Sequence, residues 1–338
     1  MGAYQPSNIF VVLVGLFILG LNILLGYKIA QIKDLKFARL IAWVHVIASF
    51  LLVNSLTFDQ PYGFRMLGIL GTLLYSSKGI VFVEEKATGK CELSFFQWIC
   101  FSMFWFGMRP KLFLDLGKDK LDNADKLIWI GIRRIFIGVL FIFASWWISK
   151  YLEIYLGHIV DAEEVALIIS VSMLIGFSLI LHFGIINVVA GFWRYFGVDC
   201  HKLFRDPLRS KSLSEFWGRR WNMAFVGLIV IGLYRPLSIR IGTSSASFVS
   251  FLAAGLLHEL AISVPVNAGY GYPTLYFMLQ GLLVAFEKYM EKTNRRIDRQ
   301  ESVNFIWALL SVILLLPILF HGPFVRGVVW PIINYQGP

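Results

Sequence analysis

A histidine and a glutamate stand side by side in an otherwise uncharged apolar stretch. Between Arg240 and Glu287 the only Asp, Glu, Lys or Arg residue is Glu259, and His258 precedes it. An acid near the centre of a bilayer costs about 2.5–3.5 kcal/mol, so such residues normally face a protein interior or a wet cavity. Neighbouring helix positions point about 100° apart. We therefore expect one of the two side chains to face a reaction site and the other a structural partner.

The histidine could supply a base, because a buried neutral imidazole stays available to accept a proton near neutral pH. The alternative for His258 is a buried side chain that only bonds a backbone carbonyl of a neighbouring helix. The small residues Ala253, Ala254 and Gly255 precede it and allow close helix approach, which suits either interpretation.

A second group of residues that could bind a ligand lies ahead of another apolar run. The segment Ser214–Asn222 (SEFWGRRWN) holds two arginines, two tryptophans and an asparagine. Arginine forks suit phosphate groups, and tryptophan suits the boundary between water and lipid. An acidic, phosphate-rich donor that arrives from the cytoplasm would meet Arg219 and Arg220 here, beside Trp217 and Trp221. The alternative is a common basic anchor with an aromatic belt.

Other chemistries have weaker signals. Ser247 and Ser250 lie on or near the His258 helix, but no Gly-x-Ser-x-Gly turn supports a serine nucleophile. The three cysteines are scattered, and no Cys-x-x-Cys pair or histidine-rich tract is present. The sequence therefore predicts neither a metal site nor a disulfide framework.

The composition is that of a membrane protein. Of 338 residues, 57% are hydrophobic and 15% are charged, against about 45–50% and 25% in soluble domains. These values exclude a soluble fold, a disordered chain, a disulfide scaffold and a fibrous repeat. The net charge of +10 indicates basic loops at an anionic cytoplasmic surface rather than nucleic-acid binding.

Apolar runs long enough to cross a bilayer predict an all-α fold, a polytopic transmembrane helical bundle of about 8–9 spans with interfacial helices. We treat residues 1–338 as one integral membrane domain, in which residues 1–90 form the N-terminal spans. The candidate spans are Ile9–Tyr27, Leu40–Leu56, Met66–Val83, Leu127–Ser149, Ala166–Val189, Asn222–Ile239, Ser244–Val264, Tyr272–Phe286 and Val303–Phe320.

The basic loops predict the orientation. The first and fifth loops hold four and seven lysines and arginines, whereas the second and fourth hold little more than Arg65 and Lys150. This difference places the first and fifth loops in the cytoplasm and the N-terminus outside. Three candidate spans then separate the fifth loop from the basic stretch Lys288–Arg299, and this would place that stretch outside. We therefore expect one of the three not to cross fully, as is tolerated where a helix lines a protein cavity.

The long third loop, Glu84–Lys126, carries an aromatic run from Phe95 to Phe106. Such a run predicts an amphipathic helix lying in the membrane interface. The alternative is a short buried helix that packs against the bundle.

Several motifs resemble the membrane-bound O-acyltransferase superfamily (MBOAT), and most closely its wax synthase branch. The similar segments are Trp105–Pro110 (WFGMRP), Asn187–Gly197 (NVVAGFWRYFG), Phe204–Pro207 (FRDP), Phe216–Asn222 (FWGRRWN) and Leu256–Glu259 (LLHE). The resemblance covers roughly residues 100–290, which would form an MBOAT/wax synthase-like catalytic core. Residues 291–338 would add a C-terminal span and tail. The first 90 or so residues carry no matching motif.

The resemblance implies that His258 is the catalytic base and Asn222 its partner. It implies acyl-CoA as a co-substrate, with no other cofactor and no metal. Arg219, Arg220 and Lys211 would bind the CoA phosphates, and Trp217, Trp221 and Glu259 would complete the substrate-binding residues. The implied acceptor is a lipophilic alcohol, so the expected reaction is wax ester synthesis in a multi-pass membrane enzyme of the endoplasmic reticulum or a bacterial inner membrane.

Other functions stay open at this stage. A short acyl group such as acetyl could be transferred to a sterol, terpenoid or glycan hydroxyl. A transporter could use His258 and Glu259 as a proton relay, although no internal repeat of the kind common in transporters is visible. A membrane scaffold is the remaining class. Acyl-CoA, the alcohol and membrane lipids are the expected partners, nucleic acid is not, and the sequence leaves homo-oligomerisation open.

Overall fold

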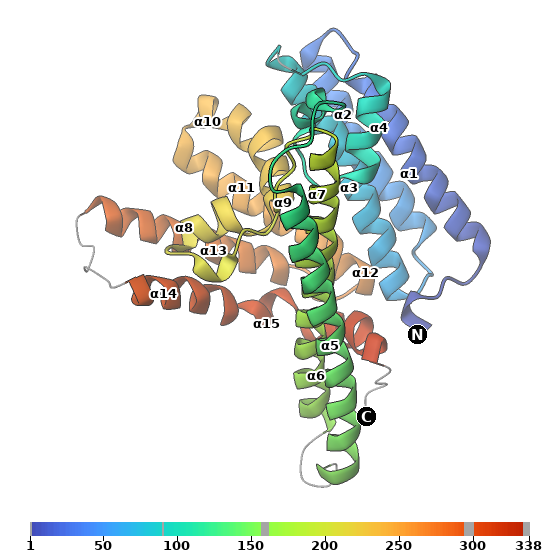
Figure 1. The fold of residues 1–338 in the computed structure, drawn as a ribbon, viewed down its shortest axis with the longest axis vertical. Coiled ribbons are helices and arrows are strands. Elements are labelled where there is room, and N and C mark those ends of the chain that lie inside the picture. The colour runs from blue at the N-terminus through green and yellow to red at the C-terminus, as the bar shows by residue number, and fades with distance from the viewer. Residues whose placement is uncertain (1, 90, 157–161, 294–300, 334–338) are drawn as a thin grey trace.

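A computed structural model describes residues 2–89, 91–156, 162–293 and 301–333, and these residues form helices and connecting loops with no strand. Figure 1 shows their arrangement. The α-helices are α1 (Ile9–Ile29), α2 (Leu35–Leu56), α3 (Tyr62–Ala87), α4 (Phe95–Phe104), α5 (Ala124–Leu156), α6 (Ala162–Ile180), α7 (Ile186–Tyr195), α8 (Leu213–Glu215), α9 (Met223–Ile229), α10 (Arg235–Ile241), α11 (Thr243–His258), α12 (Val264–Val266), α13 (Tyr272–Lys292), α14 (Glu301–Ile313), α15 (Leu316–Leu319) and α16 (Gly322–Phe324).

Short 3-10 and π-helical segments join or interrupt these helices. The 3-10 segments are Gly2–Tyr4 (η1), Pro110–Asp115 (η2), Pro207–Arg209 (η4) and Trp330–Ile333 (η9). The π-helical turns are Leu181–Ile185 (η3), Phe216–Arg220 (η5), Val230–Tyr234 (η6), Glu259–Ser263 (η7) and Val325–Val329 (η8). Single π-turns inside helices are frequent at functional sites, and two of these lie beside Asn222 and His258.

The expected polytopic helical fold is confirmed. Seven helical segments within the described residues are long and apolar enough to cross a membrane: Ile9–Ile29, Leu35–Leu56, Tyr62–Ala87, Ala124–Ile148, Ile168–Tyr195, Met223–Ile241 and Thr243–Val266. A bent pair, Phe305–Leu319 and Gly322–Ile332, makes up to eight if it is counted as one span. The chain is an integral membrane protein by the length and composition of these helices.

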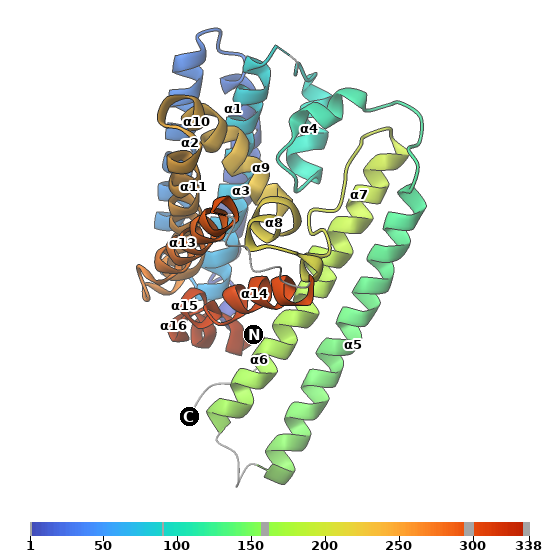
Figure 2. The same cartoon turned by 90° about the vertical axis from the view of Figure 1, so that its left-hand side faces the viewer.

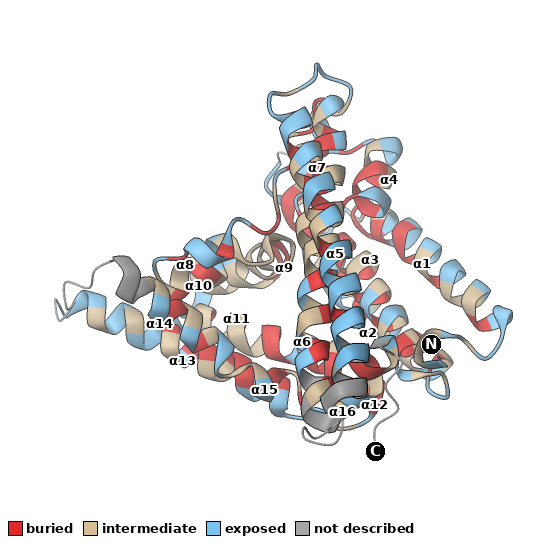
Figure 3. Ribbon diagram, turned by 60° about the horizontal axis from the view of Figure 1, so that its bottom comes forward, coloured by how far each residue is buried: buried red, intermediate tan, exposed pale blue. Residues whose placement is uncertain are grey.

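The surface of the bundle carries large apolar side chains, as a surface in contact with lipid would. Exposed examples on α1 are Ile9 and Phe17, and on α5 they are Trp129 and Phe136. Exposed residues recur along the outer sides of α1, α5 and α6 in Figure 3. In Figures 1 and 2 the antiparallel helices α5 and α6 lie side by side and project beyond the other helices. Patches of this extent on a folded chain indicate a membrane or a partner surface.

Two of the nine expected spans differ in the structure. The expected span Tyr272–Phe286 is a helix, α13, but it is not apolar enough to belong to the seven. In Figure 1 it runs across the view, whereas α1 and α5 run along the long axis. The expected span Val303–Phe320 corresponds to Phe305–Leu319, which is bent by 73° against the following helix Gly322–Ile332 and has the composition of a span only together with it. Of the three spans expected between the fifth loop and Lys288, α13 is therefore the one that lacks the composition of a full crossing.

The basic stretch that raised the orientation conflict begins at the end of α13, and its residues 294–299 lie outside the described residues. Its beginning is placed. The Glu287 carboxylate accepts hydrogen bonds from the backbone N–H groups of Leu213 and Ser214, both at 2.9 Å. Because Leu213 and Ser214 belong to the fifth loop, that loop and the end of α13 lie together, as expected if one of the three spans fails to cross.

The third loop contains the short helix α4, which has two different faces. A capping box closes its start, in which Ser94 and Gln97 bond reciprocally. Trp98 and Phe101 are fully buried, and the Trp98 indole N–H donates to the Ile23 carbonyl of α1 at 2.9 Å. Phe96, on the other side, is exposed. The buried face agrees with the alternative of a helix packed against the bundle. The exposed face is compatible with a helix at the membrane interface, and that position stays a prediction.

Lys78 interrupts the apolar sequence of α3 and holds the loop that follows α4. Its side chain is fully buried, and the ammonium group donates to the carbonyls of Trp105 at 2.6 Å and Gly107 at 2.7 Å. It also lies 4.1 Å from the centre of the Phe101 ring. A buried ammonium group is tolerated only when its donors are satisfied. Lys78 therefore fixes the Trp105–Pro110 segment against α3.

We predict that Lys78→Met lowers the stability of the protein, because two buried carbonyls lose their donor, at a cost of about 1–3 kcal/mol. The thermal unfolding midpoint in detergent measures this change. Lys86→Met is the matched control, since Lys86 bonds Gln31 at an exposed position and its loss should change stability by no more than about 0.5 kcal/mol. Equal shifts in the two variants would contradict the assignment.

Candidate functional site

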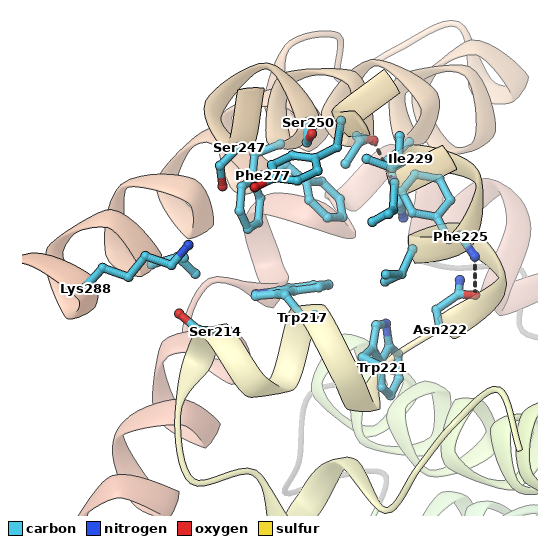
Figure 4. A pocket seen from close by; sticks show the side chains of 18 residues that line it. Ser214, Trp217, Trp221, Asn222, Phe225, Ile229, Ser247, Ser250, Phe277 and Lys288 are labelled. Atoms are coloured by element: carbon cyan, nitrogen blue, oxygen red, sulfur yellow. Dashed lines mark hydrogen bonds between the residues drawn. The ribbon is translucent and has the colours of Figure 1, made fainter. Parts of the chain in front are cut away.

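A cavity of about 260 Å³ lies between the segment 214–234 and the helices α11 and α13. Figure 4 shows its lining from close by. The residues that line it are Ser214, Trp217, Gly218, Trp221, Asn222, Phe225, Val226, Ile229, Val230, Tyr234, Ser247, Ser250, Phe251, Ala254, His258, Phe277, Val284 and Lys288. Four residues expected at the site are among them: Trp217, Trp221, Asn222 and His258. The lining is mostly apolar with a few polar groups, as is usual for small-molecule sites.

Asn222 marks the junction between the π-helical turn η5 and helix α9. Its backbone is left-handed, with φ 42° and ψ 63°, a conformation that asparagine tolerates better than most residues. Its Oδ1 accepts a hydrogen bond from the Phe225 N–H at 3.1 Å and so caps α9. The amide NH₂ group of Asn222 has no hydrogen-bond partner among the described residues. The asparagine thus offers two N–H donors at the cavity wall.

His258 ends helix α11 and lies between two aromatic rings. Its ring centre is 4.2 Å from that of Phe277 and 5.3 Å from that of Phe225. Nδ1 lies 2.7 Å from the Ala254 carbonyl, which can only accept, so Nδ1 carries the proton. The lone pair of the neutral imidazole is then on Nε2, which has no hydrogen-bond partner in the described chain. This tautomer is the one that a general base requires.

Asn222 and His258 are linked through Phe225. The backbone N–H of Phe225 bonds the Asn222 side chain, and the Phe225 ring contacts the His258 ring edge to face. A rearrangement of α9 would therefore change both residues together. The structure brings the two expected catalytic residues to the wall of one cavity.

Close contact between α11 and α13 positions the histidine. A Cβ atom at Gly255 would lie 2.8 Å from the Thr274 Cα, a distance that side chains do not tolerate. The glycine lets the two backbones touch, and Phe277, one turn after Thr274, then reaches the His258 ring. The expectation that small residues before His258 allow close helix approach is confirmed at Gly255.

Glu259 faces away from this cavity. Its Oε1 accepts three hydrogen bonds at the start of α13, from the Gly271 N–H at 2.9 Å, the Thr274 N–H at 3.0 Å and the Thr274 hydroxyl at 2.9 Å. Its Oε2 is buried without a partner in the described residues. A carboxylate at a helix N-terminus satisfies unpaired N–H groups and interacts favourably with the helix dipole. Glu259 is the member of the pair that faces a structural partner.

The two arginines expected to bind phosphate have different surroundings. Arg220 pairs with Glu215 through its Nη2 at 2.7 Å, and its Nη1 donates to the carbonyls of Arg205 and Asp206. Partial burial alone would raise the pKa of Glu215, but the Lys211 N–H and the Arg220 guanidinium lower it. Arg220 therefore ties the segment around Pro207 to the turn η5.

Arg219 and Lys211 are exposed, and neither lines the cavity. The structure does not bring Arg219, Arg220, Lys211 or Glu259 to the cavity wall with His258 and Asn222. The sequence pattern of two adjacent arginines did not distinguish a ligand contact from a bond within the loop.

Trp217 forms one long side of the cavity, and a hydrogen bond to a buried side chain of α13 fixes its ring. Its indole N–H donates to the Gln280 Oε1 at 3.0 Å, and the Gln280 Nε2 donates to the Ser311 carbonyl at 2.7 Å. Gln280 is fully buried. Trp221 stacks on Phe216 with ring centres 5.5 Å apart and meets Phe204 edge to face at 5.1 Å. The motif aromatics therefore shape the cavity wall.

Sequence reasoning did not assign Lys288, Ser214 or Phe277 to the site. Lys288 and Phe277 reach the cavity from α13, and Ser214 reaches it from the short helix α8. Only the basic stretch beginning at Lys288 gave a signal, and it pointed to membrane orientation. Helix α13 had been expected as a plain span, so its residues were not considered as ligand contacts.

Ser247 and Ser250 also line the cavity. The Ser250 hydroxyl donates to the Ala246 carbonyl at 2.7 Å, as helical serines commonly do. Neither serine bonds a histidine in the part of the chain that is described. Within the same residues, no group of three or more His, Cys, Asp or Glu side chains is placed to hold a metal ion.

Comparison with known proteins gives similarity to one family over part of the chain. Residues 200–280 match the sequence profile of the membrane bound O-acyl transferase family, and this segment contains both Asn222 and His258. The resemblance to membrane-bound O-acyltransferases is confirmed. The match lies within residues 100–290, the region over which the motifs were similar.

Individual relatives of this MBOAT segment carry acyltransferase names. A long-chain-alcohol O-fatty-acyltransferase of Simmondsia chinensis is 26% identical over 142 residues, which are 37% of this chain and 40% of the relative. A probable long-chain-alcohol O-fatty-acyltransferase 8 of Arabidopsis thaliana is 31% identical over 124 residues, or 32% and 37%. Diacylglycerol O-acyltransferase 1 of Dictyostelium discoideum is 26% identical over 202 residues, or 55% and 32%. The chain thus spans about two fifths of the length of the alcohol acyltransferases that it matches.

For Glu259 we predict a structural role in this MBOAT segment. Glu259→Ala removes the acceptor for three donors at the start of α13 and should lower stability by about 1–3 kcal/mol. Glu259→Gln keeps an oxygen acceptor and should lose less stability, with turnover per folded molecule close to wild type. Thermal unfolding in detergent and specific activity test this pair. A selective loss of turnover at normal thermal stability would instead place Glu259 in the chemistry.

Proposed function

We propose that this chain is an acyl-CoA-dependent O-acyltransferase that transfers a fatty acyl group to the hydroxyl of a lipophilic alcohol, forming a wax ester. The observation that carries the proposal is the pair His258 and Asn222 on the wall of one apolar cavity within the segment that matches the family. The names of the alcohol acyltransferase relatives support a long-chain alcohol as the acceptor.

The proposed reaction uses the free Nε2 of His258 as the base. It accepts the proton of the alcohol hydroxyl as the alkoxide oxygen attacks the thioester carbonyl carbon. The resulting tetrahedral oxyanion collapses, the C–S bond breaks, and the sulfur of CoA leaves. The imidazolium returns the proton to the leaving thiolate. Since Nδ1–H stays bonded to the Ala254 carbonyl throughout, the ring keeps one orientation and tautomer.

Asn222 has the groups needed to stabilise the oxyanion. Its Oδ1 is occupied by the Phe225 N–H, so the amide can offer only N–H donors to the cavity. A fixed donor directed at developing negative charge typically contributes a factor of 10²–10³ to turnover. We assign Asn222 the role of oxyanion donor for this reason.

The cavity lining would keep water from the thioester. The rings of Phe225 and Phe277 lie beside His258, Phe251 also lines the cavity, and Ile229 lies on the same side as Phe225. Excluding water both strengthens the electrostatic interactions and prevents hydrolysis of the donor. We propose direct transfer in a complex of both substrates, because neither cavity serine bonds a histidine within the described residues. The proposed co-substrate is acyl-CoA, with no other cofactor.

A sterol is the second candidate acceptor. An acyl-CoA–sterol O-acyltransferase 1 of Arabidopsis thaliana is 26% identical over 132 residues of the chain. Its name pairs the same donor with a different lipophilic hydroxyl. The membrane is proposed to be the endoplasmic reticulum or a bacterial inner membrane, where acyl-CoA arrives from the cytoplasm.

The decisive experiment is incubation of the purified protein with labelled palmitoyl-CoA and a pool of long-chain alcohols, sterols and diacylglycerol, followed by lipid mass spectrometry. We expect labelled wax esters to dominate the products. Labelled sterol ester alone would select the second candidate. No consumption of acyl-CoA, together with flux of a solute in liposomes, would reject the enzyme in favour of a transporter.

We predict that His258→Ala lowers the turnover number by at least about 10²-fold, because the general base is lost. The protein should still elute as a folded species in detergent. His201→Ala is the matched control, since His201 is exposed and pairs with Asp199 away from the cavity. Near-normal turnover in His258→Ala would remove this residue from the mechanism.

We predict that Asn222→Asp lowers the turnover number about 10²–10³-fold with little change in stability. The aspartate oxygen can still cap α9 through the Phe225 N–H, but the amide donors are gone. Initial rates at saturating substrates and the thermal midpoint provide the two measurements. A loss of stability that accounts for the lost activity would indicate that Asn222 serves only as a helix cap.

A further inference from the structure

Lys288 is the one lysine or arginine among the described residues that line the cavity. It lies near the end of α13, and Figure 4 shows its ammonium group directed from the helix towards the cavity. Ser214 and Lys288 lie at one end in this view and Asn222 at the other, with Trp217 between them. The cavity therefore has a cationic end and a reactive end joined by an aromatic wall.

Lys288 forms no ion pair with another described residue, so its charge is available for a ligand. Its acidic neighbour Glu287 already accepts the N–H groups of Leu213 and Ser214. The Ser214 hydroxyl at the same end is buried without a partner in the described part of the chain. An unpaired cation beside an unsatisfied hydroxyl fits an anionic group of a ligand.

The arginines that the sequence favoured for this role are less suitable. Arg220 is engaged by Glu215 and by two backbone carbonyls, and Arg219 is exposed outside the cavity lining. Moving Arg220 to a ligand would leave Glu215 without its partner. Lys288 can bind an anion with no such loss.

The distance between the two ends agrees with the shape of the proposed donor. Phe277, which contacts His258, and Lys288 are eleven residues apart on α13, a rise of about 16 Å. Helical side chains lean towards the helix N-terminus, so the Lys288 ammonium reaches back towards Phe277. The arm between the diphosphate and the sulfur of CoA has about twelve bonds, equal to about four extended residues or roughly 13–14 Å.

We infer that Lys288 binds the diphosphate of acyl-CoA at the cationic end of the cavity, so that the pantetheine arm runs along Trp217 and the thioester reaches His258 and Asn222. This inference rests on the proposed function and names the residue that recognises the donor. It assigns to α13 the phosphate contact that the sequence assigned to the arginines.

The test compares two donors with the same acyl group, palmitoyl-CoA and palmitoyl-pantetheine, which lacks the phosphates. Lys288→Glu should raise the KM for palmitoyl-CoA about tenfold with little change in kcat, as expected for one charge-assisted contact. The KM for palmitoyl-pantetheine should not change. Lys288→Arg should restore most of the affinity for palmitoyl-CoA. Higher salt should raise the wild-type KM for palmitoyl-CoA and have less effect on Lys288→Glu.

Lys292→Glu is the matched control, because Lys292 lies one turn further along α13, is exposed and does not line the cavity. It should leave both KM values near wild type. An equal rise in KM for both donors, an equal effect of Lys292→Glu, or a selective rise in Arg219→Glu in place of Lys288→Glu would overturn the inference.

Measuring the binding of CoA itself distinguishes a failure of this inference from a failure of the proposed function. If wild-type protein acylates no alcohol but binds CoA, and Lys288→Glu weakens that binding about tenfold, the inference holds and the acceptor must be sought elsewhere. If the wild type acylates alcohols and Lys288→Glu binds CoA normally, the inference fails and the proposed function stands. If the wild type neither binds nor consumes CoA thioesters, both fail.

Discussion

The crossing of α11 and α13 determines the geometry of the site. Two glycines allow it: a Cβ at Gly255 would lie 2.8 Å from the Thr274 Cα, and a Cβ at Gly281 would lie 3.1 Å from the Phe251 Cβ. The contact has two consequences at the C-terminal end of α11. It presses Phe277 against the His258 ring, and it brings the N-terminus of α13 onto the Glu259 carboxylate. Since packed interiors deform little, a larger side chain at either glycine would displace both.

Hydropathy was enough to predict the helical class and most spans, because an 18-residue apolar helix has few stable environments other than a bilayer. It failed at α13, which is less apolar than the seven candidate spans and whose last turns carry Glu287 and Lys288, of which Lys288 lines the cavity. The pair His258 and Asn222 was also predictable, through the cost of a polar group among apolar residues and through the family motif. The role of Glu259 was predicted only in part. Helix geometry shows that the adjacent side chains of His258 and Glu259 point in different directions, but not which of the two meets a structural partner.

Long-range contacts determine which of the expected residues reach the cavity. Arg220 bonds carbonyls at positions 205 and 206, and Glu287 bonds N–H groups at 213 and 214, so both depend on how distant loops meet. The motif segments upstream of residue 200 are likewise positioned by contacts between parts of the chain that are distant in sequence. The Trp193 indole donates to the Phe104 carbonyl, and Lys78 holds the carbonyls of the next residues in that loop. A Cβ at Gly227 of α9 would lie 3.3 Å from the Met108 Cβ, which joins this scaffold to the helix that Asn222 caps.

The separation of His258 from Glu259 bears on the choice between an enzyme and a proton-coupled transporter. A relay requires the two groups to exchange a proton, directly or through water. Here the Glu259 Oε1 is held by three donors from α13, while the His258 Nδ1–H is held by its own helix and Nε2 belongs to the cavity. The carboxylate serves as a cap for the N-terminus of α13, where its three hydrogen bonds occupy Oε1. The arrangement favours a fixed base beside an apolar substrate chamber over a proton path that passes through both residues.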